Sequence, residues 1–131
     1  MNRSFFLLIC SALSFVFGCI LFMLPRFASQ LLGLTIDIET LSVIRGMGGL
    51  IIGNGFTNLL LRKSLDVPII KSVLIINMIT HLLGLLADAW GIYDGALSFI
   101  QIIPVELTHL FIGSGSLFYY LQLGSSKNNN D

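Results

Sequence analysis

Residues 5–24 of the chain read FFLLICSALSFVFGCILFML, a run of twenty residues that contains no charged side chain. A helix needs about 20 predominantly apolar residues to cross the hydrocarbon core of a bilayer. The segment Phe5–Leu24 therefore predicts a membrane-spanning helix, and this prediction sets the fold class for the rest of the chain.

Three further segments have the length and apolar character of a membrane span. They are Leu41–Leu61, Ile69–Ala87 and a last segment that ends near Leu123. The last span begins either at Ser98 or a turn or two later, with Pro104 as a proline of its first turn. The sequence thus predicts an all-α integral membrane four-helix bundle.

The composition supports a lipid environment. Of the 131 residues, 55% are hydrophobic and 11% are charged, and the mean hydropathy is +0.91. Soluble domains average roughly 45–50% apolar and about 25% charged residues. Seven basic residues balance seven acidic ones, so the chain lacks the basic excess that nucleic-acid binding requires.

Short polar or amphipathic segments connect the predicted spans. Pro25 ends the first helix, and Arg26–Leu34 is amphipathic, which predicts a short interfacial helix after the first span. Residues 62–68 form a polar turn. We expect residues 1–124 to make one transmembrane domain and residues 125–131 to be a polar disordered tail.

The basic residues predict the orientation. If both termini are cytoplasmic, most of the basic residues lie on the cytoplasmic side of the membrane. The other side then has Arg26 and three acids, Asp37, Glu39 and Asp94. By the positive-inside rule both termini then face the cytoplasm, in the cytoplasmic membrane of a bacterium. The basic residues on the cytoplasmic side are Arg3, Arg62, Lys63, Lys71 and Lys127.

The beginning of the chain also resembles a signal peptide, because Arg3 precedes an apolar run. Val16-Phe17-Gly18-Cys19 approximates a lipoprotein cleavage site, but Phe17 stands where a small residue is wanted. Because apolar residues continue to Leu24, the length favours a retained span.

Small residues recur at helical spacing in the predicted spans. Such residues let helices approach closely, and polar side chains beside them form hydrogen bonds between helices. These patterns predict helix packing through five glycines: Gly46, Gly49, Gly53, Gly84 and Gly113.

Ionisable residues inside the spans mark a candidate site. A charged side chain within a bilayer usually faces the protein interior and is paired, because its exposure to lipid is costly. In the predicted topology these residues lie at similar or neighbouring depths and could line an outward-opening polar cavity. The candidate ligand-binding residues are Arg45, His81, Asp88, Glu106 and His109.

Three interpretations of this cluster remain open. In the first it is structural, with Arg45 paired to Glu106 or Asp88 and the histidines bonded across helices. In the second it binds a small polar or amphipathic ligand, a lipid headgroup or a proton. In the third His81, Glu106 and His109 supply metal ligands, although the single Glu106-x-x-His109 motif lacks the additional glutamates of di-metal bundles.

The chain resembles a family of small bacterial four-helix membrane proteins of unknown function that are loosely DoxX-like. The resemblance covers roughly residues 24–120 and rests on Pro25 with Leu32-Gly33-Leu34, IRGMGGLIIGNG at the start of the second span, His81 and His109. It implies the four-helix fold and transfers no activity.

Two functional hypotheses follow from these patterns. The first is a non-enzymatic subunit or accessory protein that packs in the lipid bilayer against copies of itself or a larger membrane complex. The second is a membrane enzyme or carrier that uses the polar cavity. No nucleophile elbow, phosphate-binding loop, dinucleotide fingerprint or CxxC motif identifies a reaction or cofactor.

Overall fold

The computed structural model describes residues 1–34 and 37–125, and every regular element in these ranges is a helix. The predicted all-α class is therefore confirmed. The predicted disordered tail covered residues 125–131, and residues 126–131 of it lie outside the described residues. The five helices are α1 (Arg3–Met23), α2 (Pro25–Leu31), α3 (Ile38–Leu61), α4 (Val67–Tyr93) and α5 (Phe99–Ser125).

Local sequence signals set the helix ends. The side chain of Asn2 caps α1 by accepting a hydrogen bond from the amide of Phe5, and Asp66 caps α4 in the same way through the amide of Ile69. Such caps satisfy amides that lack a partner in the first turn. Gly33 and Gly95 follow α2 and α4 with φ angles of +72° and +73°, a conformation that glycine adopts without a steric penalty.

Most of the predicted boundaries agree with the structure. α2 forms where the short helix after Pro25 was expected. α5 begins at Phe99, which agrees with the earlier of the two predicted starts and leaves Pro104 inside the helix. α4 continues past the predicted end at Ala87 to Tyr93, because the first strong terminator is Asp94-Gly95.

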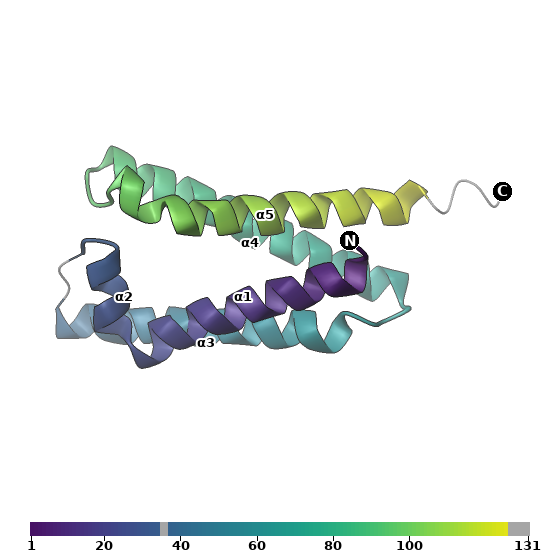
Figure 1. The fold of residues 1–131 in the computed structure, drawn as a ribbon, viewed down its shortest axis with the longest axis horizontal. Coiled ribbons are helices and arrows are strands. Elements are labelled where there is room, and N and C mark those ends of the chain that lie inside the picture. Colours follow the sequence, from purple (N-terminus) through teal and green to yellow (C-terminus); the bar gives the residue numbers. More distant parts are fainter. Residues whose placement is uncertain (35–36, 126–131) are drawn as a thin grey trace.

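The long helices form two antiparallel pairs, α1 with α3 and α4 with α5 (Figure 1). Both described ends of the chain lie at the same end of the molecule as the α3–α4 turn, and α2 lies at the other end (Figure 1). The pairs pack on each other through α1, α4 and α5 in a buried core. This core consists of Phe6, Leu7, Cys10, Ile70, Val73, Leu74, Ile112 and Tyr119.

Glycine permits the close approach of α1 and α3, but on a different face of α3 from the one predicted. A Cβ atom at Gly48 would lie 2.6 Å from the backbone nitrogen of Phe22, and one at Gly18 would lie 2.7 Å from Ile52. By contrast, a Cβ at Gly46 or at Gly53 would have no atom within 4 Å.

The prediction that Gly46 and Gly53 pack against a neighbouring helix is therefore wrong within this chain, and Gly49 makes only a peripheral contact with Phe22. α3 carries glycines on several sides, and α1 packs against the side that contains Gly48 and Gly55. The other glycine-rich side, with Arg45, remains exposed.

Three of the helices are long and apolar enough to cross a membrane: α1, α4 and residues 99–124 of α5. The chain therefore has the character of a membrane protein. α3 is less apolar than these three helices. Its mean hydropathy is lowered by Arg45, Asn54, Asn58 and five glycines.

Candidate functional site

The two histidines of the chain meet between α4 and α5. The Nδ1 atoms of His81 and His109 lie 2.7 Å apart, within hydrogen-bonding distance. His81 is 8% exposed and lies near the middle of α4. The structure thus brings together two of the five candidate residues.

Glycines make room for this histidine pair. A Cβ atom on Gly84 of α4 would lie 2.5 Å from Cε1 of His109, and one on Gly113 of α5 would lie 3.6 Å from Cβ of His81. Each histidine thus packs against a glycine of the opposite helix. Gly84 and Gly113, two of the glycines predicted to pack helices, therefore lie against side chains of the neighbouring helix.

Two carboxyl groups extend the cluster toward the α4–α5 loop. Asp88 Oδ2 lies 3.6 Å from His109 Nε2, so these groups are in ion-pair range if His109 is protonated. Glu106 interacts in turn with Asp88. The four side chains therefore form a row in the order His81, His109, Asp88 and Glu106. This row runs between α4 and α5, from the middle of α4 toward its C-terminal end.

Several polar atoms of this cluster are buried without a hydrogen-bond partner. They are His81 Nε2, Asp88 Oδ2 and Glu106 Oε1. A buried polar atom without a partner costs roughly 1–3 kcal/mol, which makes such atoms candidates for contact with a ligand. The cluster therefore retains capacity to bind an additional group.

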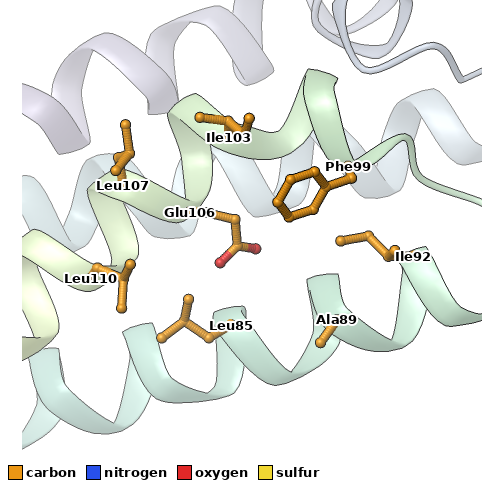
Figure 2. Close-up of a pocket in the computed structure, with 8 residues that line it drawn as sticks. All are labelled: Leu85, Ala89, Ile92, Phe99, Ile103, Glu106, Leu107 and Leu110. Carbon is orange, nitrogen blue, oxygen red and sulfur yellow. The ribbon is translucent and has the colours of Figure 1, made fainter.

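A pocket of about 380 Å³ lies beside Glu106, between α4 and α5. Figure 2 shows the Glu106 carboxylate pointing into the space between the two helices, surrounded by apolar side chains. Leu107 and Leu110 are largely exposed, so the pocket reaches the molecular surface. Its lining consists of Leu85, Ala89, Ile92, Phe99, Ile103, Glu106, Leu107 and Leu110.

Arg45 does not join this cluster. Its side chain is exposed on α3 and makes no ion pair with Asp88 or Glu106. The expected pairing is therefore wrong, because α3 packs on α1 through another face and contacts α4 only weakly. Of the five candidate residues, four come together and Arg45 lies apart.

The geometry offers no ligand set for the metal hypothesis. Among the described residues, no group of three His, Cys, Asp or Glu side chains is arranged to hold an ion. The Nδ1 atoms of His81 and His109 are directed at each other. His81, Glu106 and His109 therefore do not converge as a metal site would require.

Sequence reasoning missed a second buried polar contact, between α3 and α4. Asn77 donates to Oδ1 of Asn58 at 2.9 Å, and the reverse bond measures 3.4 Å. Both residues are completely buried. Asn58 and Asn77 are each a polar residue on a largely apolar helix, which indicated that they need a partner. The sequence did not show that they are partners of each other.

Comparison with known protein families, characterised proteins and solved structures gave no match. The resemblance to DoxX-like proteins therefore stays a prediction. The fold and the site define an all-helical protein with membrane-spanning character and a polar cluster inside one helix pair.

Proposed function

We propose that the protein is a small integral membrane protein with four spanning helices, α3 being the fourth. α3 contains 24 residues, which at 1.5 Å per residue gives about 36 Å, more than the roughly 30 Å hydrocarbon core. It runs antiparallel to α1 along its length (Figure 1). If α1 crosses the bilayer, its close partner α3 must cross as well.

The polar residues of α3 are compatible with this role. Asn58 is bonded to Asn77 inside the protein, so it need not face lipid. Arg45 lies about two turns from the start of α3, close enough for its long side chain to reach the membrane surface. The basic residues near the termini support a cytoplasmic location for both ends of the chain.

The proposed activity is the binding of an amphipathic cation in the pocket between α4 and α5. The observation that carries it is the carboxylate of Glu106 in an otherwise apolar pocket, with Oε1 buried and unpartnered. Pockets of about 300–1,000 Å³ with apolar walls and a few polar groups are typical of small-molecule sites. The exposed leucines at its mouth would admit a ligand directly from the membrane.

The charge of the cluster favours a cationic head group. Asp88 and Glu106 supply two carboxyl groups, whereas within the described part of the chain the positive charge in ion-pair range of them is limited to a protonated His109. An isolated carboxylate in an apolar setting is costly, and an opposite charge offsets that cost. An ammonium group on an apolar chain provides both the charge for Glu106 and the apolar surface for the lining.

Titration calorimetry on the full chain in dodecylmaltoside tests this proposal. Decyltrimethylammonium is the cationic probe, decanol the uncharged comparison, and protein-free micelles the blank. We expect saturable binding of the cation and at least tenfold weaker binding to Glu106→Gln, equivalent to about 1.4 kcal/mol. Equal affinity for cation and alcohol would contradict the assignment.

A matched pair of alanine variants tests the location. Ala89 lines the pocket, whereas Ala87, two residues earlier on α4, is exposed outside it. Ala89→Phe should fill the pocket and abolish cation binding, and Ala87→Phe should leave it unchanged. Loss of binding in both variants, or in neither, would place the ligand elsewhere.

A second candidate function is that of an oligomerising or accessory subunit. The exposed face of α3, with Gly46, Gly53 and Arg45, favours it, because small residues allow close contact with another helix in lipid. Single cysteines at Met47 should then form disulfide-linked dimers in the membrane. A strictly monomeric outcome for that variant would remove the support for this function.

A further inference from the structure

We propose that the end of the molecule formed by the chain start and the α3–α4 turn binds the phosphate group of an anionic phospholipid. This inference rests on the proposed membrane insertion and is independent of the cation pocket, which lies toward the α4–α5 loop at the opposite end (Figure 1). Three separate segments bring basic residues to this end. They are Arg3 of α1, Arg62 and Lys63 of the α3–α4 turn, and Lys71 of α4.

Arg3 is held against the α3–α4 turn. Its Nη2 atom donates to the carbonyl oxygen of Ser64 at 2.8 Å, and Ser64 directly follows Lys63 in the chain. The Nε atom of Arg3 is buried without an acceptor. A guanidinium carries five N–H donors in a planar fork that matches the oxygens of a phosphate. Arg3 therefore keeps donors for a further acceptor at the turn.

Lys71 is held by an aromatic ring. Its Nζ atom lies 5.4 Å from the centroid of the Tyr120 ring, which is within the range of a cation–π contact. Tyr120 belongs to α5 and packs against the buried core. This contact fixes the ammonium group near the ends of α4 and α5 and leaves its positive charge without an anionic partner.

No carboxylate neutralises these basic residues in the part of the chain that the structure describes, where none of the four side chains forms an ion pair. Asp66, the acid of the α3–α4 turn, accepts a hydrogen bond from the amide of Ile69 and so caps α4. Four positive side chains therefore accompany one negative side chain at this end. A phosphate diester can supply part of the missing negative charge.

Exposed apolar side chains beside the basic residues favour a lipid as the source of this phosphate. Phe5, Leu65 and Ile69 lie within a few residues of Arg3, Lys63 and Lys71 in the chain, and all three are exposed. Basic residues at the surface of a membrane attract anionic lipid headgroups. An anionic phospholipid provides a charge for the basic residues and acyl chains for the apolar side chains, whereas free phosphate provides the charge alone.

Electron spin resonance with spin-labelled lipids measures the preference of the inserted protein for one headgroup. The full chain is reconstituted in phosphatidylcholine vesicles that contain a trace of phosphatidylglycerol or phosphatidylcholine, each labelled on the acyl chain. The spectrum gives the fraction of labelled lipid that the protein immobilises. We expect phosphatidylglycerol to be preferred by about fivefold or more, because one basic side chain at the membrane surface contributes roughly this factor. Equal immobilisation of the two lipids would overturn the inference.

Three charge-matched variants test the location. Lys63 is exposed and forms no hydrogen bond or ion pair among the described residues, so Lys63→Gln removes a charge without removing a contact that supports the fold. Lys63→Gln should lower the preference by about twofold or more, and Arg3→Gln should lower it further because the forked donors are lost. Arg26→Gln, an exposed change on α2 at the other end (Figure 1), should leave the preference unchanged.

The remaining outcomes separate this site from its alternatives. An equal loss in Lys63→Gln and Arg26→Gln would show a diffuse attraction by the whole protein and overturn the site. Competition by inorganic phosphate, but not by sodium chloride of the same ionic strength, would assign the site to free phosphate and overturn the lipid. Release of the protein from the vesicles by alkaline carbonate would overturn membrane insertion, whereas an inserted protein without a headgroup preference would overturn this inference alone.

Discussion

The Nδ1 atoms of His81 and His109 lie 2.7 Å apart across the α4–α5 interface. Two ring nitrogens can form a hydrogen bond at this distance when one carries hydrogen and the other presents a lone pair. The two rings are therefore inequivalent, although both lie inside the same helix pair. His81 and His109 thus link the middle of α4 to Asp88, which lies nearer the end of that helix.

Nuclear magnetic resonance can detect the inequivalence, because the chain contains two histidines and no more. With ¹⁵N-labelled histidine we expect one ring with hydrogen on Nδ1 and one without it at neutral pH. His81→Asn provides the assignment. Identical tautomers for both rings in the unmodified protein would contradict the direct bond.

The α1–α3 contact predicts opposite results for two neighbouring glycines. Leucine at Gly48 would collide with the backbone of α1, whereas leucine at Gly46 would meet open space. Because backbone cannot move aside as a side chain can, Gly48→Leu should cost about 1–3 kcal/mol or more. Thermal unfolding in detergent, followed by circular dichroism, measures the difference, and equal transitions for the two variants would argue against this packing.

The buried Asn58–Asn77 pair should show strong energetic coupling. Replacing either residue with leucine leaves the other amide buried without its partner, at a cost of roughly 1–3 kcal/mol. The double variant should recover much of that loss. A double-mutant cycle on detergent-solubilised protein measures the coupling, with exposed Thr57→Ala as the control. Additive losses would mean that the two amides act independently.

Single-cysteine labelling tests the membrane topology in a background with Cys10 and Cys19 replaced. Cysteines at Gln30 and Asp94 should react from outside the cell, and a cysteine at Ser64 should react from the cytoplasm. Labelling of Gln30 and Ser64 from the same side would show that α3 does not cross. A fully reversed pattern would preserve the four spans and overturn the orientation.

The helices and their ends were accessible from the sequence because they depend on neighbouring residues. Apolar runs of sufficient length predicted the long helices, and Pro25 predicted the boundary between α1 and α2. The depth of each polar residue followed from counting along its helix, since the rise per residue is constant. This is why His81, Asp88, Glu106 and His109 could be grouped before their contacts were known.

The rotation of each helix and the choice of its partner depended on the tertiary structure. α3 presents glycines on several sides, and a helical wheel does not show that α1 packs against Gly48 while Gly46 and Gly53 stay exposed. The same rotation carries Arg45 away from the carboxyl groups it was expected to meet. Local sequence thus determined the helices and the depth of their polar residues, whereas packing between distant segments decided which side chains touch.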